Sequence, residues 1–259
     1  LIDDKNNLGG TTLFQENECF KINNSYSNEW LKKEIETLDT IKNLTVKKRT
    51  TLAAYHSYNY LLARENLTDH LDLNERKDKI RQRLWKIRAK KVIIATGAME
   101  RPLIFNNNDR PGIILSYSIK KYIDYFGVKC GQKISLFTNN DSAYETAISL
   151  CNSGVSVNSV IDIRDRTNSL IVQQAEKLGI KIHWKSTVVN TNGYKKINSI
   201  EIMKLSDDGT AVVGKKIKEE CDCLGISGGW TPRVHLFTQS GGKLKFRDED
   251  NVFLPDKSE

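Results

Sequence analysis

"QKISLFTNNDSAYETAISLCNSGVSVNSVIDIR", residues 132–164, passes from an apolar run to a helical pattern and back to an apolar run. Continued to residue 185, the pattern predicts a strand, a helix, a strand, a helix and a strand over residues 132–140, 141–154, 155–164, 167–179 and 180–185. Gly154 and Gly179 stand where the two helices are expected to end. A βαβαβ order is typical of a parallel sheet, so we expect half of a doubly wound α/β domain.

The flanking segments predict that this unit is inserted into a second α/β domain. Before the inserted unit, we expect a strand end at 1–3, an amphipathic helix at 28–41 capped by Asn28, and extended segments at 43–56 and 83–97. A charged, solvated excursion at 64–82 lies between the two extended segments. After the inserted strands and helices, we expect an antiparallel ribbon at 187–220 and a strand at 221–227. We therefore predict a first dinucleotide-binding domain at 1–112, an inserted Rossmann-like domain at 113–220, and a return to the first domain at 221–259.

The composition argues against several classes of protein. Lys and Arg number 40 against 32 Asp and Glu, a net charge of +8, but the basic residues are spread along the chain, so we expect no nucleic-acid partner. No apolar run approaches the roughly 20 residues that span a bilayer, and no signal peptide opens the chain, so we expect no membrane association. Five cysteines without regular spacing favour a reducing, cytoplasmic location.

No catalytic or metal-binding residue is predicted. The sequence indicates no carboxylate or serine partner for any of the four histidines, so none is assigned as a catalytic base. Cys221 and Cys223 form the only close pair of cysteines, and as strand residues they are expected to share one face. Because no second pair of ligands is present, they are interpreted as structural cysteines.

Two places outside the inserted unit carry signals of a bound dinucleotide. Asp3 ends an apolar segment shortly before Gly9 and Gly10, and a carboxylate in that position accepts hydrogen bonds from the cis-diol of a ribose. Paired glycines let the chain pass close to a cofactor, although a strand end followed by an exposed turn has the same pattern. The stretch "KKVIIATGA" is expected to be a buried strand ending on Thr96, whose hydroxyl bonds locally, and Gly97, which has no Cβ to block a cofactor.

The sequence departs in three ways from flavoprotein reductases that have two dinucleotide-binding domains, and these departures narrow the choice of function. No closely spaced cysteine pair follows Gly10, so dithiol chemistry is not expected. The turn into the helix at 141–154 has no glycine and carries Asp141, which would repel a pyrophosphate, so the inserted unit is predicted to have lost nucleotide binding and Asp162 to be structural. The glycine-rich turn of the first domain is expected to precede Leu1.

Three longer stretches carry a resemblance to a known family. They are "ERPLIFNNNDRPGI" at 100–113, "FTNNDSAY" at 137–144 and "SGGWTPRVHLFTQSGG" at 227–242. Together with the neighbouring residues, they resemble the α subunit of heterotetrameric sarcosine oxidase over nearly the whole chain. The polar run 105–112 is open to two interpretations, a solvated loop or a part of the cofactor or subunit interface.

The resemblance implies a reductase-like nucleotide domain that holds NAD. It implies that Asp3 contacts the adenosine ribose, that the backbone near Leu52 meets the adenine, and that glycines and a threonine line the cofactor, at Gly9, Gly10, Thr96, Gly97, Gly228 and Gly229. For Gly228 and Gly229, a tight turn ending on Pro232 is an equal alternative. Trp230 is expected to be a core aromatic rather than a stacking platform.

The resemblance also implies the activity of a larger assembly. In that family, a β subunit carries FAD and oxidises sarcosine, FMN lies near the α/β interface, smaller subunits complete the heterotetramer, and a downstream domain places the released carbon on tetrahydrofolate in one-carbon metabolism. Two alternatives remain: an independent FAD-dependent NAD(P)H oxidoreductase, and a non-catalytic nucleotide-binding scaffold.

Overall fold

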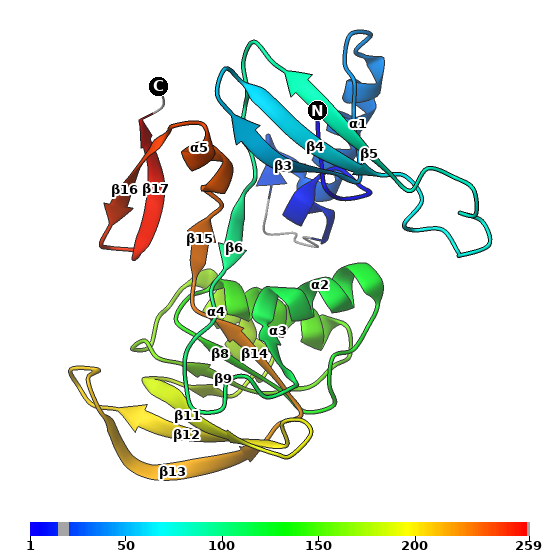
Figure 1. Ribbon diagram of the computed structural model, residues 1–259. Coiled ribbons are helices and arrows are strands. Elements are labelled where there is room, and N and C mark those ends of the chain that lie inside the picture. The colour runs from blue at the N-terminus through cyan, green and yellow to red at the C-terminus, as the bar shows by residue number, and fades with distance from the viewer. Residues whose placement is uncertain (15–20, 258–259) are drawn as a thin grey trace. The chain divides into compact units, whose positions relative to one another are not determined.

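The computed structural model describes residues 1–14 and 21–257, and it divides the chain into two compact units. Unit 1 comprises Leu1–Ala98 and Pro232–Glu259, and unit 2 comprises Met99–Thr231. Each unit is described by itself (Figure 1). The α/β class expected from the sequence is confirmed.

Unit 2 is built on a five-stranded parallel sheet with the order β10-β9-β8-β14-β7. Its strands and helices are β7 (Ile113–Leu115), α2 (Ser116–Phe126), β8 (Ile134–Thr138), α3 (Ser142–Asn152), β9 (Val157–Asp162), α4 (Leu170–Lys177), β10 (Ile182–His183) and β14 (Cys223–Ser227). The predicted βαβαβ unit is therefore present, with Gly154 and Gly179 in the left-handed backbone region after its helices. The sequence analysis did not anticipate β7 or α2.

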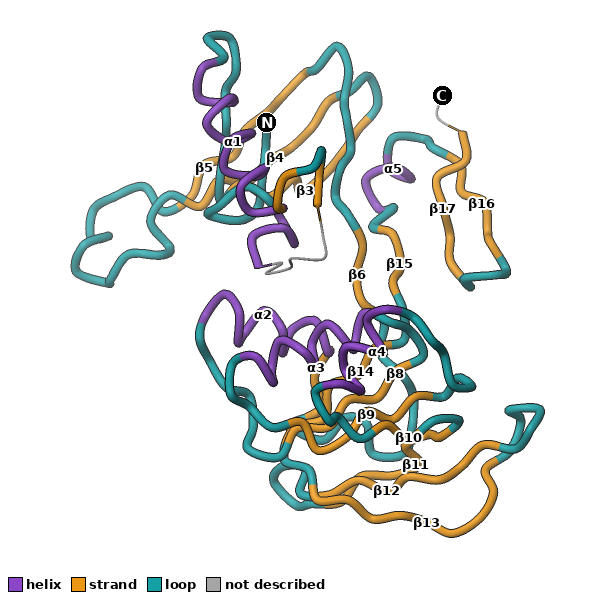
Figure 2. The backbone as a smooth tube through the Cα atoms, turned by 180° about the vertical axis from the view of Figure 1, so that it is seen from behind, coloured by secondary structure: helices purple, strands orange, loops and turns teal. Residues whose placement is uncertain are grey.

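The alternation of side chains along the strands gives the parallel sheet a buried core on each face. On β8, Leu136 packs in one core and the next residue, Phe137, in the other, and Val160 and Ile161 divide in the same way on β9. Helices α2, α3 and α4 cover the first face, and strands β11, β12 and β13 lie beyond the second (Figure 2). Because both faces are buried, every residue of β8 is buried, as expected of a central parallel strand.

The expected antiparallel ribbon is a three-stranded sheet of β11 (Ser186–Asn192), β12 (Ser199–Leu205) and β13 (Val212–Glu220). Glu219 of β13 joins this sheet to the parallel one. Its Oε1 accepts hydrogen bonds from the buried hydroxyls of Ser135 on β8, at 2.8 Å, and of Ser159 on β9, at 2.6 Å. Burial acts to raise the pKa of Glu219, but the nearby imidazole of His183 and the hydrogen bonds from Ser159 and Ser135 outweigh it and hold the pKa below its usual value.

Unit 1 contains short antiparallel sheets and one long helix. Its elements are η1 (Gly10–Phe14), β1 (Lys21–Ile22), β2 (Ser25–Tyr26), α1 (Ser27–Thr40), β3 (Thr50–His56), β4 (Tyr60–Asn66), β5 (Gln82–Arg88), α5 (His235–Gln239), β16 (Lys243–Arg247) and β17 (Val252–Lys257). The predicted helix at 28–41 is confirmed as α1, but Asn28 is not its cap. The helix begins at Ser27, so Asn28 lies inside the first turn, where its Oδ1 accepts the Glu29 N–H at 2.8 Å.

The prediction of a buried strand ending at Gly97 is wrong for this chain. Residues 91–97 have no regular secondary structure, and the side chain of Ile93 is 93% exposed. No described strand pairs with this segment, so its backbone has no ladder of hydrogen bonds, and Val92 and Ile94 are only partly buried. At the other end of unit 1, the expected strand end at Leu1–Asp3 is a single parallel bridge between Ile2 and Lys47.

Two paired strands carry the chain between the units, namely β6 (Ala98–Glu100) and β15 (Trp230–Pro232). The changes of unit at Ala98/Met99 and Thr231/Pro232 lie outside residues 113–220, and β14, which follows residue 220, belongs to the sheet of unit 2. The functional division at 112 and 220 stays a prediction.

The two close cysteines do not share a face. Cys221 precedes β14 and packs in the core on the side of the antiparallel sheet, whereas Cys223 lies in β14 and packs in the core on the side of the helices. Burial raises the pKa of Cys221 to about 11 and that of Cys223 to about 12. In the described part of the chain, no three His, Cys, Asp or Glu side chains are placed to hold a metal ion.

None of the helices formed by residues 1–14 and 21–257 combines the length and the apolar character needed to cross a bilayer.

Candidate functional site

The backbone of Asp3 is fixed against the strand that contains Leu52. Asp3 donates its N–H to Lys47 O and accepts the N–H of Thr50, the first residue of β3, each at 2.9 Å. Its carboxylate Oδ1 accepts the N–H of Lys5 at 2.8 Å, and the side chain is only half-buried. Two of the predicted contact residues, Asp3 and Leu52, are therefore brought to neighbouring backbone segments of unit 1.

Gly9 and Gly10 have different roles in the local structure. Gly9 has φ +124°, and a Cβ there would lie 2.5 Å from Leu31 Cδ2 of α1, so its lack of a side chain is explained by packing on that helix. Gly10 begins η1 with φ +55°, and nothing lies within 4 Å of the position of a Cβ. Of the two, Gly10 has the open surroundings that a bound group requires.

Thr96 and Gly97 contact the returning chain rather than their own neighbours. Thr96 Oγ1 donates to Arg233 O at 3.0 Å, and the Arg233 N–H donates to Gly97 O at 2.9 Å. The expected local hydroxyl bond of Thr96 is therefore replaced by one to a residue 137 positions away. Gly97 has φ +68° and open space around the position of a Cβ.

Gly228 and Gly229 lie in unit 2, whereas the six other predicted contact residues belong to unit 1. The Gly228 N–H donates to Arg101 O at 2.7 Å, and Gly229 O accepts the Arg101 N–H at 2.8 Å. A Cβ on Gly228 would lie 2.8 Å from Pro102 O. The close approach that these glycines permit is thus to residues 101–102 of the same chain.

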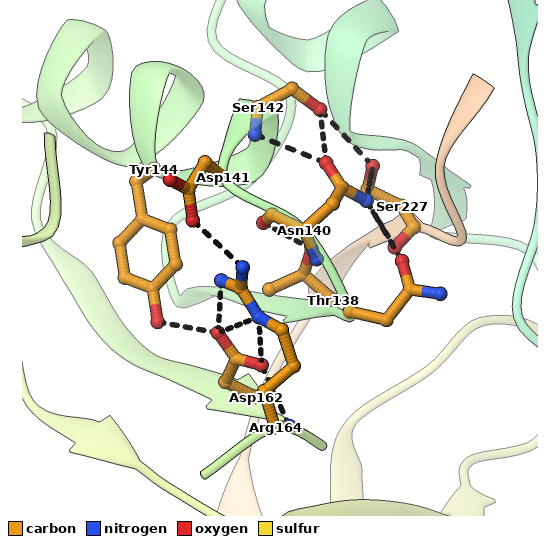
Figure 3. A network of polar contacts seen from close by, with 9 residues as sticks. Thr138, Asn140, Asp141, Ser142, Tyr144, Asp162, Arg164 and Ser227 are labelled. Carbon is orange, nitrogen blue, oxygen red and sulfur yellow. Dashed lines mark hydrogen bonds and ion pairs between the residues drawn. The ribbon is translucent and has the colours of Figure 1, made fainter. Parts of the chain in front are cut away.

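A cluster of charged side chains lies at the carboxyl end of β9, and the sequence alone did not indicate that these side chains are in contact. Asp162 is fully buried, and its carboxylate accepts hydrogen bonds from Arg164 Nη2 and Tyr144 OH, each at 2.8 Å (Figure 3). Arg164 also pairs through Nη1 with Asp141 at 2.8 Å. Burial would lower the pKa of Arg164, but the two carboxylates raise it instead, and burial together with Asp162 raises the pKa of Tyr144.

A second cluster of hydrogen-bonded polar side chains lies at the start of α3. Asn140 Oδ1 accepts the N–H of Ser142 at 3.0 Å, and Asn140 Nδ2 donates to Ser227 O at 3.2 Å and Ser227 Oγ at 3.0 Å (Figure 3). In a doubly wound sheet, ligands bind outside the carboxyl ends of the strands, here β8, β9 and β14. Because this chain's own side chains occupy those hydrogen-bonding positions, the arrangement favours a structural role for Asp162 and for the start of α3.

Glu100 is a buried carboxyl group in unit 2. Its Oε2 accepts the N–H of Tyr117, in the first turn of α2, at 2.8 Å, and its carboxylate also bonds the Ser227 side chain. Burial raises the pKa of Glu100 against these hydrogen bonds. The residue therefore fixes the start of α2, a role that its sequence position did not indicate.

The polar run at 105–112 binds the antiparallel sheet of unit 2. Asn107 Nδ2 donates to Asn190 Oδ1 at 2.8 Å, and Thr191 Oγ1 donates to Asn107 O at 2.9 Å. Arg110 bonds Thr191 Oγ1 at 3.3 Å and also Gly193 O. These contacts hold the run against β11.

Sequence comparison finds relatives along nearly the whole chain. The sarcosine oxidase subunit alpha of Corynebacterium sp. (strain U-96) is 36% identical over 255 residues, and that of Rhizobium meliloti (strain 1021) is 30% identical over 260 residues. Each match covers 98% of this chain, but 26% and 24% of the two relatives. The chain thus spans about a quarter of the length of these relatives. No family model matches it.

Structural comparison finds a similar fold in solved reductases and dehydrogenases. Thioredoxin reductase from T. acidophilum superposes with a TM-score of 0.64 over 95% of this chain and 73% of its own length, at 19% identity. L-proline dehydrogenase from P. horikoshii gives 0.63 over 100% of this chain and 42% of its own, at 21% identity. The reductase-like fold expected from the sequence is therefore confirmed.

Proposed function

Given that this chain is homologous to about a quarter of the sarcosine oxidase α subunit, we propose that it is the NAD-binding segment of such a subunit. The observation that carries the proposal is the match to three curated α subunits over nearly the whole chain, 30–36% identical. The reductase-like fold of the segment supports a nucleotide as its ligand.

The complete oxidase is proposed to demethylate sarcosine oxidatively. Sarcosine, O2 and water give glycine, formaldehyde and H2O2, and with tetrahydrofolate the released carbon appears as 5,10-methylenetetrahydrofolate. Bound FAD and FMN, in the β subunit or at its interface, supply the redox chemistry, and a downstream domain binds the folate. This segment contributes no catalytic residue to that reaction, and it assembles with the β subunit and the smaller subunits.

The predicted contact residues of unit 1 are of the types that bind one end of a dinucleotide. Asp3 is a half-buried acid whose backbone is fixed by Lys47 and Thr50, so its carboxylate can be held toward a ribose diol. Gly10 and Gly97 combine left-handed backbone with open space, which admits a close approach by a diphosphate or a ribose. In this proposal, Asp3 binds the adenosine ribose, Leu52 lies near the adenine, and the backbones of Gly10 and Gly97 line the cofactor.

The proposal is tested by identifying the nucleotide. The full-length α subunit is purified with its partners, separated from them, denatured and analysed by chromatography with mass detection. We expect about one NAD per α subunit. FAD in place of NAD would instead indicate the independent flavin-dependent reductase.

The ribose contact is tested by Asp3→Asn, with its neighbour Asp4→Asn as the matched control. Loss of hydrogen bonds to a charged carboxylate costs about 1.5–3 kcal/mol, so the dissociation constant of NAD should rise roughly 10- to 100-fold. Asp4 is exposed and pairs with Lys5, so its variant should retain NAD. Equal NAD occupancy in the two variants would rule out this ribose site.

A measurement of peroxide formation distinguishes a catalytic assembly from a non-catalytic scaffold. Sarcosine-dependent H2O2 release is measured for the complete oxidase and for the α subunit alone. We expect release only from the complete oxidase. An assembly that retains NAD but forms no peroxide would support the non-catalytic scaffold.

A further inference from the structure

The end of helix α2 presents a cluster of exposed apolar side chains. Tyr122, Tyr125, Phe126 and Val128 are 44%, 39%, 55% and 49% exposed. The rings of Tyr125 and Phe126 meet edge to face with centroids 4.9 Å apart, and those of Tyr122 and Phe126 lie 6.0 Å apart. We call these four residues the α2 patch.

The α2 patch flanks the face of the helix that packs in the core of unit 2, where α2, α3 and α4 cover one face of the parallel sheet (Figure 1). Ile119 is fully buried in the core between α2 and the parallel sheet, and Ile123 packs against the same core. The helix ends at Gly127, whose φ of +63° allows the Val128 N–H to return to Tyr122 O at 2.8 Å. Ile119, Ile123 and Phe126 follow one another at helical spacing, so the patch continues the packed side of α2 to the exposed end of the helix.

Two lysines, Lys121 and Lys129, border the α2 patch. Lys121 Nζ lies 5.8 Å from the centroid of the Phe126 ring, and Lys129 is exposed and bonds only the neutral Gln132 side chain at 2.9 Å among the contacts described. The single carboxylate of α2, on Asp124, is turned inward, where it is 5% exposed and bonds Lys120 and Ser149. A complementary surface would thus offer apolar side chains inside a rim of Asp and Glu.

We propose that the α2 patch is the contact surface for another subunit of the same oxidase, one with an apolar surface rimmed by acidic residues. Exposed aromatic clusters of this kind are enriched at protein interfaces, where Tyr and Phe provide much of the binding energy, and the basic rim selects an acidic partner. The inference rests on the proposed function only in taking the partner from the same oxidase.

The first test removes the aromatic rings. The full-length α subunit carrying Tyr125→Ser and Phe126→Ser is compared with Tyr194→Ser, whose side chain is 93% exposed between β11 and β12 of the same unit. Binding to the remaining subunits is followed by analytical ultracentrifugation. We expect the double variant to raise the dissociation constant at least 10-fold and Tyr194→Ser to leave it unchanged. An unchanged constant in the double variant overturns the proposal.

The second test reverses the charge and leaves the rings in place. Lys121→Glu with Lys129→Glu should weaken assembly at low salt, and the difference from the natural protein should shrink at high salt, where the charges are screened. Lys195→Glu, in the loop beside Tyr194, is the matched control. Equal affinity of the reversed and natural subunits at low salt overturns the acidic partner even where the ring variant fails to fold.

Two further outcomes identify other occupants of the patch. If the isolated α subunit forms a homodimer that the ring variant abolishes, or if that variant lowers the melting temperature without changing assembly, the proposed partner is wrong. NAD content is measured in the same preparations. An assembly defect with full NAD content supports the patch, whereas absence of NAD from every preparation refutes the proposed function alone.

Discussion

A single guanidinium, that of Arg164, neutralises two carboxylates at the carboxyl end of β9. Asp162 is fully buried and depends on Arg164 for its charge partner, so Arg164→Ala should lower the free energy of unfolding by about 3–5 kcal/mol. Arg166→Ala is the control, because Arg166 is 65% exposed and its pair with Glu176 should contribute less than about 1 kcal/mol. Urea denaturation measures both variants. Similar losses would show that Asp162 does not depend on Arg164.

A second residue, Glu100, should make stability depend on pH. Burial raises its pKa in the folded protein above that of the unfolded chain, so its contribution to stability is present at low pH and is lost as pH rises through the folded pKa. Glu100→Gln removes the charge and can still accept the Tyr117 N–H. The variant should therefore gain stability relative to the natural protein as pH rises from 4 to 7. A constant difference across that range would contradict the raised pKa.

Single residues were predictable from the sequence only where the signal is local. The left-handed backbone at Gly154 and Gly179, where the sequence predicts the ends of two helices, is such a signal, because glycine adopts this backbone readily. The contacts of Asp162 were not predictable, because Tyr144 and Arg164 reach it from two different elements. Thr96 likewise bonds a residue on a distant part of the chain, which no local pattern encodes.

Among the elements, β14 packs closely against helix α2. A Cβ on Gly225 would lie 2.5 Å from Leu136 Cδ2 and 2.7 Å from Ile119 Cδ1 of α2. Gly225→Ala should therefore lower the free energy of unfolding by about 1–3 kcal/mol. Ile119→Val deletes the Cδ1 atom, so adding it to Gly225→Ala should recover part of the loss in a double-mutant cycle. Strictly additive losses would show that the two residues are not in conflict.

The elements of unit 2 were largely predictable, whereas several of unit 1 were not. The strands and helices at 132–185 carry apolar periods, and Gly154 and Gly179 follow the two helices closely, after Asn152 and Lys177. Helix α2 was missed although Ile119, Ile123 and Gly127 have the right spacing, because the polar run before it masked its start. The segment at 91–97 has the composition of a buried strand but no described partner, since pairing is a property of the sheet rather than of the segment.

At the scale of the whole molecule, the chain enters and leaves unit 2 through two paired strands. Because β6 and β15 are hydrogen-bonded neighbours, the ends of residues 99–231 lie close together, and the unit has its own core. We expect residues 99–231, expressed alone, to fold cooperatively with mixed helix and strand content. Circular dichroism during thermal unfolding measures this. A spectrum without secondary structure would show that unit 2 needs the rest of the chain.

The contact of Glu219 with Ser135 and Ser159 also bears on how faithfully the two sheets assemble. Strand side chains alternate between faces, so a shift of β13 by one residue would bring Lys218 or Glu220 to face the parallel sheet in place of Glu219. Lys218 offers only donors and cannot accept the two serine hydroxyls, whereas the carboxylate of Glu220 could accept them, so the contact discriminates against the shift that places Lys218 there. The carboxylate of Glu219 thus favours the observed alignment of β13 over the one that would place Lys218 against the two serines.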